Sequence, residues 1–552
     1  MTEALEVAMA QLNPVVGDVD GNVEQICRAW TAAAGSDLVV CGELALAGYP
    51  PEDLVLKRAF QDRIEHAVDR LAKYTDGGGP ALLVGAPWRE DGRLHNASVL
   101  LECGRIGAIR FKHDLPNYGV FDEKRVFSAG PLPEVVRFRN VPVGIMICED
   151  MWTPPVARHL AGQGAELFVV LNGSPFEVSK PNTRYDLASA RAAEADAPVL
   201  YVNLVGGQDE LVFDGASFAC LPDQEVCARA PAWQEGITRT QWRRQGDAGW
   251  TCHSAPMAPE VNGLESVYTA MVVGLRDYVA KNRFPGVVIG LSGGIDSALT
   301  AVVAVDALGA ERVHCVMMPS PFTSTDSLED AAEVARRARI RLDSVGIEPA
   351  MDAFATMLAP LFIGCGRDVT EENIQARARG LVLMAISNKF GHLLVTTGNK
   401  SEMSVGYATL YGDMCGGFSV LKDIYKTTVF ALARWRNQAH CPEFRGPPGR
   451  VIPERVITKA PTAELRANQT DQDTLPPYDL LDAILMALVE EEASIDDLVG
   501  RGFDRATVRR VWRMIDRAEY KRRQAPPGVK ITRRAFGRDR RYPITNGFTE
   551  LA

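Results

Sequence analysis

The chain has 552 residues, which is too many for one ordinary hydrophobic core, so we expect two or more domains. Its hydrophobic content of 46% and charged content of 24% are typical of a soluble globular protein. The formal net charge of −10 argues against a nucleic-acid partner, which would bind a basic face, although a local basic patch is compatible with an acidic total.

Eleven cysteines are scattered along the chain without a CxxC pair, which indicates neither a disulfide framework nor a zinc site. This usage is typical of a reducing compartment, so we expect a cytoplasmic protein. The first residues, MTEALEVAMAQLNP, lack the basic start and the continuous apolar core of a signal peptide. No run of 18 apolar residues occurs, so we expect no membrane partner.

The first half of the chain predicts short strands that alternate with helices. The strands are expected at residues 7–12, 38–41, 81–84, 106–111, 143–148, 167–171 and 199–204, and helices at 22–34 and 60–73. This alternation indicates layered α/β packing. Between about residues 220 and 260 the pattern gives way to a segment rich in proline, glycine and tryptophan, which we interpret as the end of the first domain and a linker.

The second half predicts a parallel, doubly wound, Rossmann-like α/β sheet. Its expected strands are 287–291, 313–317 and 393–396, and its expected helices are 264–282, 297–308, 328–339 and 373–390. We therefore expect two domains, residues 1–262 including the linker and residues 263–552.

A glycine-rich loop follows the first strand of the second half. It consists of Gly290, Leu291, Ser292, Gly293, Gly294, Ile295, Asp296 and Ser297. Its glycines let the backbone approach phosphates, its serines supply hydroxyl donors, and the following helix directs its positive end at an anion. Asp296 can hold a magnesium ion against the phosphates. A turn without a ligand is the simpler interpretation of two glycines alone, but the strand and helix around SGGxDS favour ATP binding.

The loop lacks the GxxxxGK[ST] pattern of a Walker A motif. It resembles instead the pyrophosphatase loop of the N-type ATP ligases. The resemblance implies that ATP is cleaved between its α and β phosphates, that a carbonyl oxygen is adenylated, and that pyrophosphate is released.

Three polar residues of the first half stand at the ends of predicted strands: Glu43, Lys112 and Cys148. Strand ends of layered α/β sheets gather in one pocket. There, a carboxylate can take the thiol proton and a lysine can stabilise the developing charge, so that the thiolate attacks an amide and expels ammonia. Taken singly, the cysteine has a simpler interpretation as core packing, and the two charged residues as surface groups.

The segments GELALAGYPPEDL, FKHDLPNYGVFDEKRVF and GIMICEDMW resemble the carbon–nitrogen hydrolase, or nitrilase, family over roughly residues 5–220. The resemblance implies a layered α-β-β-α domain with Glu43, Lys112 and Cys148 as its triad and Glu123 as its second, supporting glutamate. It also implies glutamine as the substrate, bound by Tyr118, Ser174 and Lys180. An ordinary turn at NGSP and a solvated Lys180 are equally compatible with the sequence.

The order of the two halves resembles the glutamine-dependent NAD synthetase family over nearly the whole chain. The resemblance implies ATP contacts at Thr397, Lys426 and Thr462, deamido-NAD contacts at Asn373, Glu402, Asp413 and Lys521, and magnesium at Asp296 and Glu402. It further implies an internal passage for ammonia, no tightly bound organic cofactor, and a homo-oligomer that is a dimer or larger, possibly an octamer.

Simpler interpretations of the later motifs remain open at this point. Asn373 could cap a helix, Thr397 could belong to a plain turn, Lys426 could snorkel from a helix, and Lys521 could lie on a solvated basic face. Three rival functions also remain: an adenylating amidotransferase for a nucleotide ring, a tRNA-modifying enzyme, and a non-enzymatic scaffold. The nitrilase-like first half disfavours the first rival. The acidic charge and the lack of CxxC disfavour the second, and the complete Glu–Lys–Cys set disfavours the third.

Overall fold

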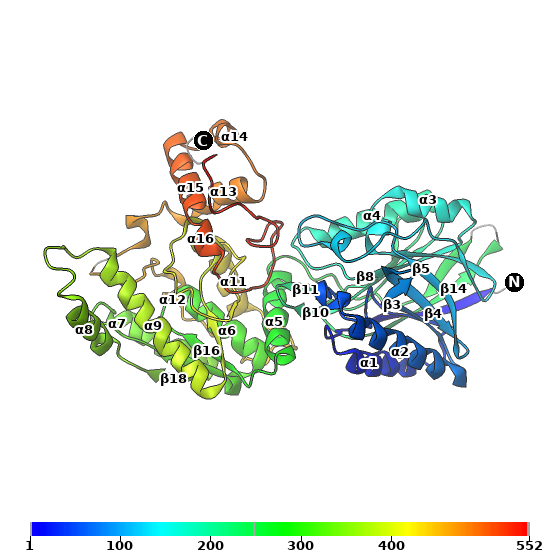
Figure 1. Cartoon of the computed structure of the whole chain (residues 1–552), viewed down its shortest axis with the longest axis horizontal. Coiled ribbons are helices and arrows are strands. Elements are labelled where there is room, and N and C mark those ends of the chain that lie inside the picture. Colours follow the sequence, from blue (N-terminus) through cyan, green and yellow to red (C-terminus); the bar gives the residue numbers. More distant parts are fainter. Residues whose placement is uncertain (1–2, 247–248, 468, 549–552) are drawn as a thin grey trace. The chain divides into compact units, whose positions relative to one another are not determined.

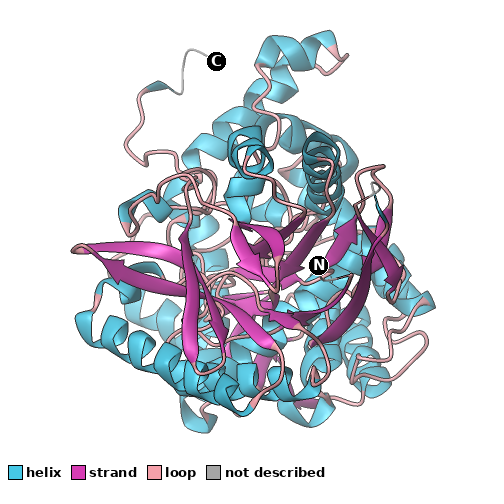
Figure 2. Cartoon of the chain, turned by 90° about the vertical axis from the view of Figure 1, so that its right-hand side faces the viewer, coloured by secondary structure: helices cyan, strands magenta, loops and turns pink. Residues whose placement is uncertain are grey.

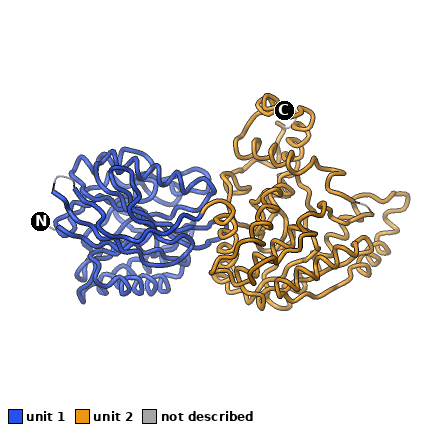
Figure 3. The backbone as a smooth tube through the Cα atoms, turned by 180° about the vertical axis from the view of Figure 1, so that it is seen from behind, with its two compact units in different colours: residues 1–261 blue, residues 262–552 orange. Residues whose placement is uncertain are grey.

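The computed structural model describes residues 3–246, 249–467 and 469–548. The chain divides into two compact units, residues 1–261 and 262–552 (Figure 3). Within the described residues, none of the helices combines the length and the apolar character needed to cross a membrane.

The first unit contains two large sheets (Figure 1). In spatial order, the seven-stranded sheet comprises β15 (Trp250–Ser254), β14 (Gly236–Arg244), β1 (Ala4–Gln11), β2 (Leu38–Val40), β3 (Ala81–Glu90), β4 (Arg93–Glu102) and β5 (Arg105–Phe111). The six-stranded sheet comprises β13 (Val226–Arg229), β12 (Phe218–Cys220), β9 (Val199–Asn203), β8 (Leu167–Asn172), β7 (Val141–Ile147) and β6 (Val136–Phe138). A separate hairpin joins β10 (Val205–Gln208) to β11 (Leu211–Asp214).

The two sheets pack face to face and helices cover their outer faces (Figure 2). The alternation of side chains along β1 decides which layer each residue joins. Val7 and Met9 enter the core between the sheets, whereas Ala8 and Ala10 face α1 (Val19–Ala32) and α2 (Arg58–Tyr74). On the other side, α3 (Pro154–Gly162) and α4 (Lys180–Ala195) cover the six-stranded sheet. The expected α-β-β-α layering is confirmed.

Residues 220–260 end the first unit, as expected, but they contribute strands to its sheets rather than forming a linker. This segment supplies β13, β14 and β15, and β14 pairs along its length with β1 in the middle of a sheet. The inward side chains of β14 are Thr238, Thr240 and Trp242. Two of these three buried positions carry a hydroxyl, so the strand lacks the aliphatic alternation by which a half-buried strand is recognised. β4 was not expected either.

The second unit is built on a five-stranded parallel sheet, which confirms the expected doubly wound fold. Its spatial order is β18 (Arg341–Ser344), β17 (Val313–Met317), β16 (Val287–Gly290), β19 (Leu393–Thr396) and β20 (Phe418–Ser419). The winding direction reverses between β16 and β19, and ligands of such sheets bind beyond the strand ends at this reversal. The loop at 290–297 leaves β16 at that point.

Helices surround this sheet and extend beyond it. They are α5 (Gly263–Lys281), α6 (Ile295–Leu308), α7 (Thr325–Ala338), α8 (Glu348–Leu358), α9 (Val369–Phe390), α10 (Lys400–Val405), α11 (Lys426–Gln438) and α12 (Glu454–Thr458). Towards the C-terminus, α13 (Tyr478–Val489), α14 (Ile495–Gly500) and α15 (Arg505–Arg517) share an apolar core, and the short α16 (Glu519–Arg522) follows.

Candidate active sites

The first unit buries a lysine between two glutamates. Lys112 follows β5, and its Nζ lies 2.7 Å from Glu43 Oε1 and 2.9 Å from Glu123 Oε1. The side chains of Lys112 and Glu43 are fully buried. Burial alone would lower the pKa of Lys112, but Glu123 and Glu43 hold it well above its usual value. The structure thus brings three of the four expected catalytic residues into hydrogen-bond contact, with the lysine between the two glutamates.

Neighbouring groups hold both glutamates in place. Asn96 Nδ2 donates to Glu43 Oε1 at 2.8 Å, and the backbone N–H of Gly173 donates to Glu43 Oε2 at 2.8 Å. The hydroxyl of Tyr49 donates to Glu123 Oε1 at 3.0 Å. Burial raises the pKa of Glu123, and the Lys112 charge opposes that rise. These contacts fix Glu43 beside the lysine.

Cys148 stands directly after β7, at the start of a 3-10 turn (Cys148–Met151). Its backbone φ of +47° places it in the left-handed region, which non-glycine residues seldom adopt and which recurs at functional turns. Burial raises the pKa of its thiol, the Glu43 charge raises it further, and Lys112 opposes both. Because these surroundings disfavour the thiolate, the attack needs a base that takes the thiol proton.

The expected glutamine residues lie on three different segments. The Tyr118 hydroxyl donates to Glu149 Oε2 at 3.0 Å and Oε1 at 3.1 Å. Lys180 Nζ lies 5.0 Å from the ring centre of Phe121 and 5.6 Å from that of Trp152, so this lysine is not a plain solvated charge. The buried Ser174 Oγ accepts from Arg184 Nε at 3.1 Å.

Sequence reasoning missed three of these neighbours: Glu149, Phe121 and Trp152. Glu149 directly follows the cysteine in GIMICEDMW, so the motif itself contained the signal. Phe121 and Trp152 become relevant only because folding places their rings beside Lys180.

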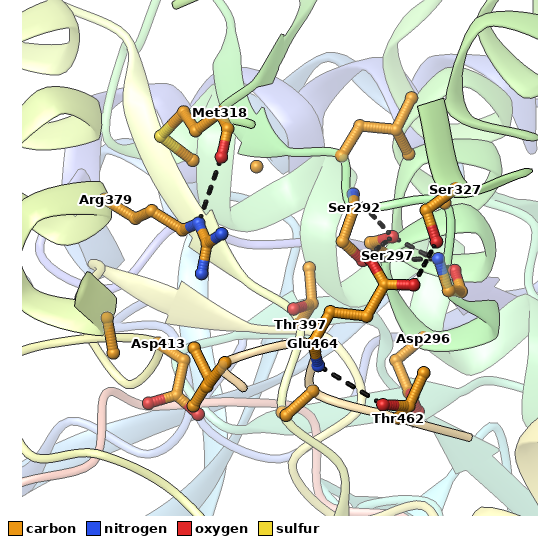
Figure 4. Close-up of a pocket in the computed structure, with 18 of the residues that line it drawn as sticks. Ser292, Asp296, Ser297, Met318, Ser327, Arg379, Thr397, Asp413, Thr462 and Glu464 are labelled. Atoms are coloured by element: carbon orange, nitrogen blue, oxygen red, sulfur yellow. Dashed lines mark hydrogen bonds between the residues drawn. The ribbon is translucent and has the colours of Figure 1, made fainter. Parts of the chain in front are cut away.

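The second unit contains a cavity of about 290 Å³ at the end of β16 (Figure 4). All eight residues of the 290–297 loop line it, and so do Thr397, Glu402, Asp413, Lys426 and Thr462. Asn373 and Lys521 lie outside this lining but contact the adjoining segment. Asn373 Oδ1 accepts from the Thr409 hydroxyl at 3.2 Å, and Lys521 Nζ donates to two backbone carbonyls, at Gly406 (2.8 Å) and Ala408 (2.7 Å).

Serine hydroxyls brace the loop from inside. Ser297 Oγ lies 3.0 Å from Ser292 Oγ and donates to the Gly294 carbonyl at 3.0 Å. The backbone N–H of Gly294 in turn donates to Ser292 Oγ at 3.2 Å. Gly293 has a φ of +84°, and a Cβ there would stand 2.2 Å from the Ser327 carbonyl oxygen. The loop therefore needs glycine at 293 both for its conformation and for its closeness to α7.

We expect Gly293→Ala to weaken binding of ATP, the expected ligand of this loop, about tenfold or more, because the added methyl group must push the loop away from Ser327. Gly294→Ala is the matched comparison, since its Cβ would meet only Ser292 Oγ at 3.4 Å. Equilibrium titration of each variant with ATP measures both. Equal effects of the two substitutions would contradict the steric argument.

An ammonium group bridges two of the acidic residues that line the cavity. Lys426 Nζ forms ion pairs with Asp296 and with Glu402, the latter at 3.0 Å. Asn399 Nδ2 donates to Asp296 Oδ1 at 2.8 Å. Burial raises the pKa of Glu402 to about 7, and the charge of Lys426 opposes the rise. Burial would lower the pKa of Lys426, but Asp296 and Glu402 hold it far above its usual value.

Several further residues line the cavity that the motifs did not single out: Ser327, Arg379, Lys459, Glu464 and Asp471. Arg379 Nε donates to the Met318 carbonyl at 3.1 Å, and burial lowers its pKa to about 10 (Figure 4). Lys459 Nζ donates to Ser327 Oγ at 2.6 Å. Their positions could have indicated two of these residues, because Arg379 lies two residues beyond the motif NIQAR and Lys459 is the first residue of the motif KAPTAEL.

Comparisons with known proteins cover both units. A family model described as carbon-nitrogen hydrolase matches residues 6–246, and one described as NAD synthase matches residues 267–525. The chain is 50% identical over 549 residues to a glutamine-dependent NAD(+) synthetase of Rhodobacter capsulatus, and 44% identical over 579 residues to one of Thermotoga maritima, with 99% of each chain covered in both cases. It also superposes on a solved glutamine-dependent NAD+ synthetase of Acinetobacter baumannii in complex with adenosine diphosphate, with 43% identity, a TM-score of 0.78 and 99% coverage of each chain.

Proposed function

Because the chain belongs to the family of glutamine-dependent NAD(+) synthetases, we propose that residues 1–262 release ammonia from glutamine and that residues 263–552 join it to deamido-NAD. The overall activity is ATP-dependent, glutamine-dependent NAD synthesis, a carbon–nitrogen ligase reaction. The observation that carries the assignment is the buried Glu43–Lys112–Glu123 cluster in the same chain as the glycine-rich loop at the end of β16.

In the glutaminase reaction, Glu43 takes the thiol proton while Cys148 Sγ attacks the side-chain amide carbon of glutamine. Lys112 stabilises the negative charge that develops on the carbonyl oxygen. The proton passes to the departing nitrogen, the C–N bond breaks, and ammonia leaves. Glu43 then activates a water molecule, which hydrolyses the thioester to glutamate and restores the thiol. Glu123 supports the lysine from its other side.

Charged side chains recognise both the α-carboxylate and the α-amino group of glutamine. We assign its α-carboxylate to the ammonium of Lys180, which the rings of Phe121 and Trp152 hold in place. The α-amino group fits the Glu149 carboxylate, to which the hydroxyl of Tyr118 donates. Ser174 shapes the pocket beside them.

In the second unit, the 290–297 loop cradles the ATP phosphates with its backbone and the N-terminus of α6. Thr397 and Thr462 contact ATP. The carboxylate of deamido-NAD attacks the α-phosphorus, and Lys426 neutralises the pyrophosphate that leaves. Ammonia then attacks the adenylated carbonyl carbon and AMP departs. Asn373, Glu402, Asp413 and Lys521 hold deamido-NAD.

Asp296 and Glu402 fit a magnesium ion by the chemistry of their oxygens. Magnesium in nucleotide sites binds one or two carboxylates plus substrate phosphates and keeps water molecules. This mode does not need a dedicated protein cage, and the described residues form no group of three or more candidate metal ligands. The two carboxylates share the Lys426 ammonium here, so they already hold a cation in common. Bound there, magnesium would neutralise charge on the phosphates.

An exposed apolar surface around α8 and α9 supports a homo-oligomer, a dimer or larger. The exposed side chains include Met357, Leu361, Ile363, Val369 and Leu381, with exposed fractions of 62–83%. Apolar patches of this kind mark association surfaces. We also place the enzyme in the cytoplasm, on the basis of its cysteine usage.

We expect Leu361→Asp combined with Ile363→Asp to reduce the assembled mass of the protein, because both side chains would bring charge into the apolar contact. Light scattering after size-exclusion chromatography measures that mass. Leu56→Asp, at an exposed leucine of the first unit, is the control and keeps the wild-type mass. An unchanged mass for the double variant would exclude this surface.

The direct test of function supplies purified protein with ATP, magnesium, deamido-NAD and glutamine. We expect glutamate, AMP, pyrophosphate and NAD in equal amounts. Glutamine hydrolysis without NAD would indicate a different acceptor, such as a nucleotide ring. Salt-sensitive binding of tRNA would instead favour the tRNA-modifying alternative.

A further inference from the structure

Asp150 joins two strand ends that belong to different sheets. Its carboxylate is buried, with only 1% exposure, and all three of its close partners are backbone N–H groups. Oδ1 accepts from His113 at 2.9 Å and from Asp114 at 2.8 Å, and Oδ2 accepts from Ile147 at 3.0 Å.

The donors adjoin the reacting residues. His113 and Asp114 directly follow Lys112 at the end of β5, and Ile147 directly precedes Cys148 at the end of β7. β5 is an edge strand of the seven-stranded sheet and β7 lies in the six-stranded sheet, so no ladder of strand hydrogen bonds ties their ends together. The Asp150 carboxylate forms that connection.

The contact to Ile147 also supports the unusual backbone of the cysteine. A left-handed conformation is unfavourable for a non-glycine residue and persists where the surroundings enforce it. The hydrogen bond from Ile147 closes the turn in which Cys148 adopts a φ of +47°. Burial raises the pKa of Asp150 to about 7, and the N–H groups and the charge of Lys112 oppose that rise.

We propose that Asp150 is a positioning residue for the glutaminase reaction, which sets the Cys148 thiol against the Lys112 ammonium by bridging their two strand ends. The inference rests on the proposed function. Asp150 makes no contact with glutamine in this assignment, so loss of Asp150 affects the chemical step rather than substrate binding.

Asp150→Asn is the sharpest variant, because the amide keeps the shape of the carboxylate but replaces one acceptor by a donor that faces a backbone N–H. We expect kcat for glutamine hydrolysis to fall about tenfold or more, with KM within about twofold of wild type. Alkylation of Cys148 by iodoacetamide should change in rate, and ammonia-dependent NAD synthesis should not change. Asp37→Asn is the control, since Asp37 also accepts a backbone N–H, from Glu6 at 2.7 Å, away from the site.

Asp150→Ser is measured alongside, because its smaller hydroxyl avoids the opposed donors should the asparagine impair folding. Wild-type kcat in either folded variant overturns the inference. So does a rise in KM alone, or a parallel fall of glutamine-dependent and ammonia-dependent synthesis. Failure of the wild-type protein itself to release ammonia from glutamine would overturn the proposed function instead, whatever the variants do.

Discussion

Cys148→Ala should abolish synthesis of NAD from glutamine while synthesis from ammonium salts continues at close to the wild-type rate. Removing the nucleophile of a covalent mechanism costs about 10⁴-fold or more in kcat. The proposed adenylation site lies in the other compact unit and retains every residue that lines its cavity. Parallel assays with glutamine and with ammonium chloride measure the two rates.

Cys220→Ala is the matched control, because Cys220 is a buried thiol of the same six-stranded sheet. It should keep both activities. If Cys148→Ala used glutamine at the normal rate, the amidase assignment would be wrong. If it lost both activities, Cys148 would have a structural role that the present assignment does not include.

Asp296→Ala should lose synthesis with either nitrogen source, because activation of deamido-NAD precedes the arrival of ammonia. The substitution removes a carboxylate that pairs with Lys426 in the cavity at the end of β16 and that we propose as a magnesium ligand. Loss of one such electrostatic group costs about 100-fold or more in the chemical step. Release of pyrophosphate in the presence of ATP and deamido-NAD measures that step without any nitrogen source.

Asp326→Ala serves as its control, since Asp326 is likewise an acidic residue in the first turn of a helix of this unit, but is exposed. It should keep normal pyrophosphate release. Glutamine hydrolysis should continue in Asp296→Ala. Wild-type pyrophosphate release by Asp296→Ala would remove this residue from the activation site.

The sequence anticipated those parts of the molecule in which local pattern and chemistry coincide. The aliphatic strands at 287–291 and 393–396 and the SGGxDS loop between strand and helix were recognisable because buried parallel strands are continuously apolar. β14 was not recognisable, since its inward Thr238 and Thr240 conceal the alternation.

The residues that hold the site side chains in place could not be predicted from local sequence patterns either. Asn96 and Gly173 reach Glu43 from positions 53 and 130 residues away. Lys180 packs against aromatic rings from two other segments. The hydrogen bonds of Asp150 form only when folding brings the ends of β5 and β7 together. The identity of the acceptor came from family resemblance, because no spacing of charged residues specifies a dinucleotide.

The most direct test supplies glutamine labelled with nitrogen-15 in its side-chain amide, together with ATP, magnesium and deamido-NAD. Mass spectrometry of the NAD formed then reports where the nitrogen went. If ammonia released at Cys148 reaches the adenylated carboxylate, the carboxamide of NAD carries the label. Cys148→Ala, supplied with both labelled glutamine and unlabelled ammonium, should then form unlabelled NAD. Unlabelled NAD from the wild-type protein under the first condition, or no NAD at all, would contradict it.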